Sequence, residues 1–177
     1  AMLTALAPVA WSAEALAPLE TEDVWILHRD APAIDLREVP VGDYRATVRE
    51  SDALAHAQLA MTRLQLPGEL VVDIAALIRS FVRQFGLERA NLRVEVVNKV
   101  SCPKFHCDTL HVRLITTYSG PTTQYVHRDA PETILDAPQG GLIFLKGHLH
   151  PTFGDRVHHR SPPMPEGSKR LCVVLDY

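Results

Sequence analysis

The feature that most constrains the fold is a change in the spacing of apolar residues near residue 90. Before it, apolar side chains recur every three or four positions, as they do on one face of an α-helix. After it, apolar and polar side chains alternate, as they do on a half-buried β-strand. Because the helical pattern comes first and the strand pattern follows, we expect an α+β fold in which helices buttress one face of a β-structure.

Two helices are expected in the first part of the chain. Ser51 can cap the first, and the second runs from about Glu69 to Phe85, with Gly86 where a C-terminal cap belongs. The apolar positions of the first helix are Leu54, Ala57, Met61 and Leu64, and those of the second are Val71, Ile74, Ile78, Phe81, Val82 and Phe85. Both patterns predict helices that pack against a sheet.

The strand pattern recurs in short segments separated by glycine and proline turns. These segments are 92–96, 110–115, 122–126, 142–145 and 171–175. Several short strands with such turns indicate a sandwich or a barrel. At 177 residues the chain is most simply one domain. We expect a mainly helical support layer over about 1–90 and a β-barrel over about 91–177.

Charge and cysteine content narrow the range of partners and compartments. A net charge of −3 argues against a surface for nucleic acid or an anionic membrane, and no apolar run approaches the ~20 residues that span a bilayer. The segment from Met2 to Ala13 lacks a basic region and is interrupted by Pro8, unlike a secretory signal. Three cysteines do not make a disulfide framework. We therefore expect a cytoplasmic protein, with its oligomeric state open.

A group of candidate metal ligands lies in the strand-rich half. His106 and Asp108 are two residues apart, so on a β-strand both side chains point to one face. His159, much later in the chain, adds a third ligand. Two histidines and one carboxylate form the facial triad of non-haem Fe(II) oxygenases, which leaves positions open for substrate and oxygen. The same donors also suit Zn²⁺, Mn²⁺, Co²⁺ or Ni²⁺.

Because side chains alternate between the two faces of a strand, each residue next to these ligands can be assigned to the cavity face or to the opposite face. Cys107 lies between two inward residues, so it is expected to point out of the metal cavity. His158 and His159 face opposite ways, and His158 is the alternative third ligand. A zinc site that combines Cys102, His106 and a distant histidine is a competing interpretation. Other histidines crowd this half, and His148 and His150 share a face on which they could hold a second metal or touch substrate.

Three further residues are candidates for binding an organic acid. Arg170 follows His159 by eleven residues, and its fork of donors suits a bidentate carboxylate such as that of 2-oxoglutarate. Tyr118 could donate a hydrogen bond to the same oxo-acid, although a tyrosine at the end of a strand more often serves in packing. Lys146 is a second possible anchor for an anion. The ordinary alternative for Arg170 is an ion pair with a carboxylate of the protein.

Two blocks of sequence, Pro103-Lys104-Phe105-His106-Cys107-Asp108 and His159-Arg160-Ser161-Pro162-Pro163, resemble the DUF1826 family of bacterial proteins. The resemblance covers roughly residues 20–177 and also includes Tyr118-Ser119-Gly120-Pro121-Thr122-Thr123 and Arg170-Leu171. It implies no established activity, but it does imply a link to metal homeostasis.

The order His-x-Asp, His and Arg is more remotely similar to the 2-oxoglutarate/Fe(II)-dependent oxygenase superfamily. That resemblance implies a double-stranded β-helix of the cupin or jelly-roll type. It also implies Fe(II) on His106, Asp108 and His159, with 2-oxoglutarate on Arg170. The chain is short after the triad, so the substrate is left open. The alternative function is a zinc- or other metal-binding protein of metal homeostasis with this fold and no oxygenase activity.

Overall fold

The computed structural model describes residues 9–177, so most of the segment from Met2 to Ala13 lies outside the described part. Four helical elements occur, which are η1 (Ala13–Glu20), η2 (Glu50–Asp52), α1 (Ala53–Leu64) and α2 (Leu70–Gln84). The strands are β1 (Val24–Leu27), β2 (Gly42–Val48), β3 (Ala90–Val97), β4 (Val112–Ser119), β5 (Gln124–His127), β6 (Leu135–Asp136), β7 (Leu142–Lys146), β8 (Val157–Arg160) and β9 (Arg170–Asp176). Within residues 9–177, no helix has the length and apolar character needed to cross a membrane.

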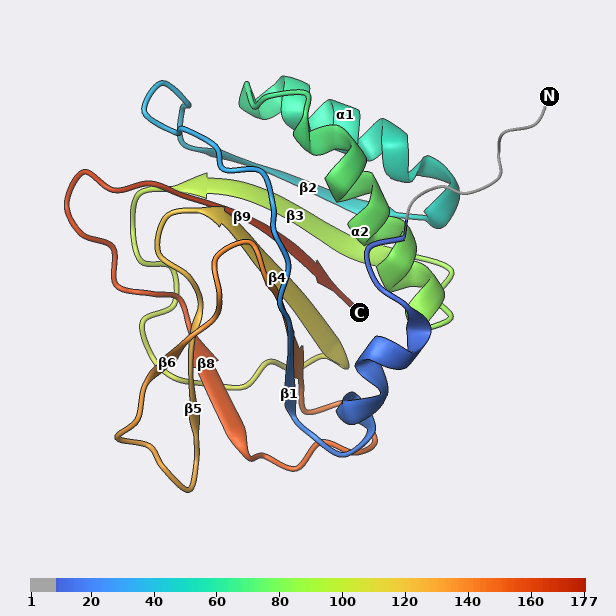
Figure 1. Ribbon diagram of the computed structural model, residues 1–177, viewed down its shortest axis with the longest axis vertical. Helices are drawn as coiled ribbons and strands as arrows, with labels where there is room; N and C mark the ends of the chain where they lie inside the picture. Colours follow the sequence, from blue (N-terminus) through green and yellow to red (C-terminus); the bar gives the residue numbers. More distant parts are fainter. Residues whose placement is uncertain (1–8) are drawn as a thin grey trace.

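The strands form two sheets in which all neighbours run antiparallel. The larger sheet has six strands in the order β1-β7-β4-β9-β3-β2, and the smaller has three in the order β6-β5-β8. Figure 1 shows α1 and α2 on one side of the larger sheet and the smaller sheet away from them. The fold is therefore a mixed one of mainly antiparallel sheets and few helices.

The main core lies between the helices and the larger sheet. On α2, Ile74, Ile78 and Phe81 are fully buried, because their helical spacing places them on one face. Leu171, Val173 and Leu175 of β9 join the same core. The intervening Cys172 and Val174 are also buried, but in a second apolar cluster that includes Val157 of β8 in the smaller sheet. The strand β9 is thus covered on both faces, which explains its nearly continuous apolar sequence.

Several expected elements are confirmed, but the first part of the chain, which was expected to be mainly helical, also contributes two strands. The helices and the segments near 92–96, 142–145 and 171–175 lie where expected. However, β1 and β2 belong to the first part and form the two edges of the larger sheet. Over residues 9–177 the strands form two separate sheets and no single closed barrel. His106 lies in an isolated β-bridge rather than in a regular strand.

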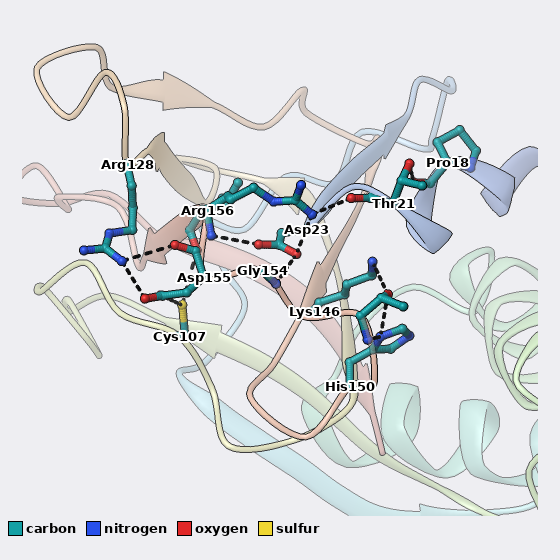
Figure 2. A network of polar contacts seen from close by, with 12 residues as sticks. Pro18, Thr21, Asp23, Cys107, Arg128, Lys146, His150, Gly154, Asp155 and Arg156 are labelled. Atoms are coloured by element: carbon teal, nitrogen blue, oxygen red, sulfur yellow. Dashed lines mark hydrogen bonds and ion pairs between the residues drawn. The ribbon is translucent and has the colours of Figure 1, made fainter.

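A buried carboxylate anchors the loop that leads into β8. Asp23 accepts hydrogen bonds from the backbone nitrogens of Gly154 (2.9 Å) and Arg156 (2.8 Å), a network shown in Figure 2. Burial acts to raise the pKa of Asp23, but these two backbone hydrogen bonds and the contact with Arg156 lower it overall. The carboxylate stays ionised and holds the segment before β8, the strand that carries His159, against the start of β1.

Candidate metal centre

A β-bridge between His106 and His159 brings the two halves of the candidate site together. Each backbone nitrogen donates to the carbonyl oxygen of the other residue at 2.9 Å. The segment that contains His106 and Asp108 is irregular, yet the bridge holds it in the same register as a strand would. Their side chains therefore point to the same side as that of His159.

The three side chains converge on one point. The Nε2 atom of His159 lies 3.1 Å from Asp108 Oδ2, and the Nε2 atom of His106 lies 3.4 Å from Asp108 Oδ1. One donor atom from each residue lies within 4.8 Å of the other two. Ligands at right angles on an ion with bonds of about 2.1 Å are about 3.0 Å apart. The observed spacing is thus close to that of three adjacent ligands on one octahedral ion.

The donor set also fits a metal because one of its oxygens lacks a hydrogen bond. Asp108 Oδ2 is buried, and among the described residues no donor reaches it with hydrogen-bond geometry. His159 and Arg113 approach this oxygen at 3.1 Å each, but only as charged or polar neighbours. A buried carboxylate oxygen without a hydrogen bond is costly. A divalent cation bound there would remove that cost.

The local hydrogen bonds leave the correct imidazole nitrogen free. His106 Nδ1 lies 2.8 Å from the carbonyl oxygen of Lys104, so this nitrogen carries the proton and donates it. Nε2 is then the unprotonated nitrogen that faces Asp108. A histidine ligand is usually oriented by a hydrogen bond of this kind from its other nitrogen.

The charges in the site are in the states that metal binding requires. Burial raises the pKa of Asp108, but contact with His159 and the charges of Arg113 and His106 bring it down to about 2. Burial lowers the pKa of His159, and this effect outweighs the attraction of Asp108 for its protonated form. At neutral pH the site therefore offers an ionised carboxylate and a neutral His159, as a metal ion needs.

The triad opens into a cavity of about 290 Å³ that also contains Arg170. The Arg170 side chain is 4% exposed, and its Nη2 donates to the hydroxyl oxygens of Thr123 (2.9 Å) and Thr117 (3.4 Å). Its Nε is buried without a hydrogen-bond partner, and no carboxylate among residues 9–177 forms an ion pair with it. The alternative role expected for Arg170, an ion pair with a carboxylate of the protein, is therefore not found among the described residues.

The expectation for Tyr118 is wrong. Tyr118 is 2% exposed and packs in the core between the helices and the sheet. Its hydroxyl donates to the Asp73 carboxylate of α2, which also binds Arg29 at 2.7 Å. Tyr118 shares the face of β4 with Val112 and Leu114, opposite to the cavity face, and this alternation explains the error.

The neighbours of the triad lie on the sides that the alternation predicts. His158 points away from the cavity and contacts Asp155 at 3.0 Å, so His159 is the histidine that joins the triad. Cys107 also points away, toward Asp155, as Figure 2 shows. Cys102 lies at the cavity, and its Sγ is 3.7 Å from His106 Nδ1. The competing zinc interpretation therefore retains one of its ligands.

The remaining candidate side chains lie elsewhere. Lys146 is buried and donates to the Thr152 hydroxyl at 2.7 Å, so it is not in the cavity with the triad. His150 accepts a hydrogen bond from the backbone of Thr152, and His148 packs on Phe153. The two histidines that share a face do not form a metal site with each other in the part of the chain that is described.

Two residues that the sequence did not single out support the site. Arg113 bridges Asp108 and Asp176, at 3.1 Å and 2.9 Å, and thereby orients the carboxylate of the triad. Thr123 supports Arg170 from the turn before β5. Arg113 could have been found, because it shares its strand face with Ile115 and Thr117. Nothing local distinguishes Thr123 from any other turn threonine.

A family model matches nearly the whole chain. The family is described as a protein of unknown function (DUF1826), and the match covers residues 9–176. No curated protein matches the chain in sequence.

Solved structures with a similar fold include a prolyl-4-hydroxylase and dioxygenases. A prolyl-4-hydroxylase from Pseudomonas putida is 16% identical with a TM-score of 0.51, and the alignment covers 93% of this chain and 96% of that one. Two plant dioxygenases for auxin oxidation align less closely. The Arabidopsis thaliana enzyme, in complex with 2-oxoglutarate, is 12% identical with a TM-score of 0.46, over 82% of this chain and 65% of that chain. The rice enzyme is 13% identical with a TM-score of 0.45, over 76% and 55%. This chain thus spans less than two thirds of the plant enzymes' length.

Proposed function

The chain belongs to the DUF1826 family, and we propose that it is an Fe(II)- and 2-oxoglutarate-dependent oxygenase. One observation carries this proposal. A single cavity contains three converging metal donors together with a buried arginine that has no carboxylate partner among the described residues. Either feature alone has several explanations. Together they are what a metal-bound oxo-acid requires.

His106, Asp108 and His159 would hold the metal ion. Two nitrogens and one oxygen on adjacent positions leave the remaining positions for other molecules. When bound, Fe(II) supplies the redox chemistry by which oxygen oxidises a substrate while 2-oxoglutarate is converted to succinate and CO₂. The chain supplies an ionised Asp108, a neutral His159 and a His106 ring fixed by Lys104.

Arg170 would bind the distal carboxylate of 2-oxoglutarate. Its guanidinium is held by Thr123 and Thr117, so the planar fork is preorganised before the oxo-acid arrives. An uncompensated buried cation is costly, and a carboxylate would compensate its charge in a dry environment. The cavity is large enough, at about 290 Å³, for a ligand of this size.

The fold is consistent with this function. We interpret the two antiparallel sheets as the two sides of a double-stranded β-helix within one domain, with the triad between them. The similarity to the P. putida enzyme over nearly the whole of both chains supports this arrangement.

The test is the binding of 2-oxoglutarate to the anaerobic Fe(II)-loaded protein, followed by calorimetry and thermal shift. Loss of a hydrogen-bonded charged partner costs about 1.5–3 kcal/mol, so Arg170→Ala should weaken binding roughly ten- to a hundredfold. Arg170→Lys should recover only part of the loss, because a lysine cannot form the bidentate pair. Metal content should be unchanged in both variants.

Tyr118→Phe is the matched control, because its hydroxyl lies on the other face of the same sheet. It should leave 2-oxoglutarate affinity intact. Failure of millimolar 2-oxoglutarate to bind the wild-type protein would contradict the proposed oxygenase.

A second candidate function is a zinc-binding protein of metal homeostasis. The observation in its favour is Cys102, whose sulfur lies beside His106 on the cavity side. In that case Cys102→Ser should lower zinc affinity by at least tenfold, and 2-oxoglutarate should not bind. If Cys102→Ser retains full zinc affinity, this second function is excluded.

A further inference from the structure

A second group of metal donors lies on the opposite side of the His106–His159 bridge. We call Cys107, Asp155 and His158 the outer cluster. Cys107 lies between the inward ligands His106 and Asp108, and His158 precedes the inward His159. We call His106, Asp108 and His159 the inner triad. Because successive side chains point to opposite sides, the two backbone segments that build the inner triad also contribute Cys107 and His158 to the outer cluster.

The donor atoms of the outer cluster are spaced as ligands of one ion. Asp155 Oδ1 lies 3.0 Å from His158 Nε2 and 3.9 Å from Cys107 Sγ, and all three donors lie within 4.8 Å of one another. With zinc bonds of about 2.3 Å to sulfur and 2.0 Å to nitrogen or oxygen, tetrahedral ligands are roughly 3.3–3.6 Å apart. The two measured separations lie on either side of that range.

The surroundings orient Asp155 for this role. Arg128 contacts Oδ2 at 2.5 Å, so the other carboxylate oxygen, Oδ1, faces Cys107 and His158. Figure 2 shows Arg128 and Cys107 on the two sides of this carboxylate. Asp155 itself has a positive φ of 53°, a conformation that few residues except Asn, Asp and Gly adopt readily. The backbone at Asp155 is thus held in an uncommon conformation.

A route from solvent reaches the cluster. A surface cavity of about 510 Å³ is lined by Arg128, Asp155 and Val157, among others. The Asp155 side chain is 46% exposed and that of His158 is 29% exposed. An ion can therefore enter from this side, and water can occupy a fourth position.

We propose that the outer cluster is a second metal site, which binds one Zn²⁺ or a similar borderline divalent ion through Cys107, Asp155 and His158. A thiolate, an imidazole and a carboxylate together favour zinc over the hard ions Mg²⁺ and Ca²⁺, which prefer oxygen alone. On binding, the Cys107 sulfur forms the metal bond, and its thiol proton leaves to solvent. This site does not depend on the proposed oxygenase activity.

Cobalt titration of the metal-free full-length protein tests the proposal. Co²⁺ replaces Zn²⁺ in such sites, and a thiolate bound to it gives a charge-transfer absorption band in the near ultraviolet. We expect two equivalents of Co²⁺ to bind, one of them with this band. Cys107→Ser should abolish the charge-transfer band and the binding of one equivalent of Co²⁺. His106→Ala should abolish the binding of one equivalent of Co²⁺ at the inner triad, whereas the charge-transfer band should persist.

Cys102→Ser is the matched control, because Cys102 lies on the cavity side of the same segment. It should leave the band unchanged. If Cys102→Ser abolishes the band instead, the thiolate belongs to the inner site and the outer site is refuted. Absence of any thiolate band in the wild-type protein would also refute it.

Asp155→Asn is a second variant that tests the outer cluster in case Cys107→Ser does not fold. Asparagine tolerates the left-handed backbone conformation as well as aspartate does, and the position is half exposed, so the fold should be retained. The loss of the charged ligand should weaken Co²⁺ at the outer site at least tenfold. Unchanged outer-site affinity in Asp155→Asn would overturn the proposed ligand set.

Discussion

At the scale of single residues, buried charges are the features with the largest energetic consequences. Arg170 is buried with two threonine hydroxyls as its partners. Asp108 is partly buried, and its buried Oδ2 accepts no hydrogen bond in the described structure. Groups of this kind are costly unless a ligand compensates them. Both line one cavity and have opposite charge, so they suit the two ligands proposed above, an anion and a cation.

Arg113 should control metal affinity without contacting the metal. Its guanidinium holds Asp108 between the triad and Asp176. Loss of such a supporting contact typically lowers metal affinity by about 10- to 100-fold, and we expect this for Arg113→Gln in competitive chelator titrations. Arg93→Gln is the control, since Arg93 lines the same cavity but pairs with Glu95. Equal affinities in the two variants would show that Arg113 has no orienting role.

Asp108 should make the stability of the metal-free protein sensitive to acid. Its pKa falls from the ordinary 3.8 to about 2 in the folded state, so the unfolded state binds the proton first. The stabilisation is present above about pH 4 and is lost as the pH falls toward 2. Urea unfolding across this range should show a steeper loss of stability in the wild type than in Asp108→Asn. Parallel pH profiles would contradict the assignment.

At the scale of secondary-structure elements, the loop after β7 packs against the segment that carries Asp108. The backbone nitrogen of His148 donates to the Asp108 carbonyl oxygen at 2.9 Å, and that of Gly147 donates to His111. A Cβ atom at Gly147 would lie 2.2 Å from the Leu110 carbonyl oxygen and 2.6 Å from that of Asp108. The close approach of these two backbones therefore requires glycine.

Gly147→Ala should consequently disturb both the fold and the metal site. Overpacking of this kind costs typically about 1–3 kcal/mol, and the displaced segment carries Asp108. We expect a lower denaturation midpoint and weaker metal binding. Gly68→Ala is the control, because a Cβ there meets nothing within 4 Å. Normal metal affinity in Gly147→Ala would show that the segment adjusts without moving the ligand.

The helices and strands that could be predicted are those whose buried residues recur at the regular spacing of one face. The helix α2 was predicted to within a residue at each end, because its apolar positions repeat at helical spacing. The strand β2 was missed, although its buried Tyr44 and Val48 alternate with exposed polar residues. The strand β8 was missed because two of its four residues are histidines.

The candidate metal donors could be expected from the spacing of His106 and Asp108 taken together with the distant His159 and Arg170. Their supporting contacts could not, because Arg113 and Thr123 meet their partners only through the pairing of distant strands. Tyr118 was considered as a donor to the oxo-acid, although the alternation along β4 places it with Val112 and Leu114 on the core side. Local patterns thus pointed to the candidate ligands, and tertiary packing determined what holds them.

At the scale of the whole molecule, the inner triad joins segments that are far apart in the chain. Only the folded state brings His106, Asp108 and His159 together, so metal binding should stabilise the fold. At 100 times its dissociation constant a ligand adds about 2.7 kcal/mol, or a rise in Tm of roughly 5–10 °C for a chain of this size. We expect this under anaerobic Fe(II) in calorimetric scans.

His159→Ala should remove most of this thermal shift. The exposed His28 lies outside both metal-donor groups, so His28→Ala should retain it. An equal shift in wild type and His159→Ala would place the stabilising ion elsewhere.

The backbone bridge between His106 and His159 also limits how this chain can change by insertion or deletion. One residue added to or removed from the segment 106–108 would turn every side chain in it to the opposite side. Cys107 would then face the cavity, and His106 and Asp108 would face solvent. Point substitutions alter one ligand at a time, but a one-residue shift would exchange two donor sets at once. The lengths of these two short segments should therefore tolerate less variation than the identity of most residues within them.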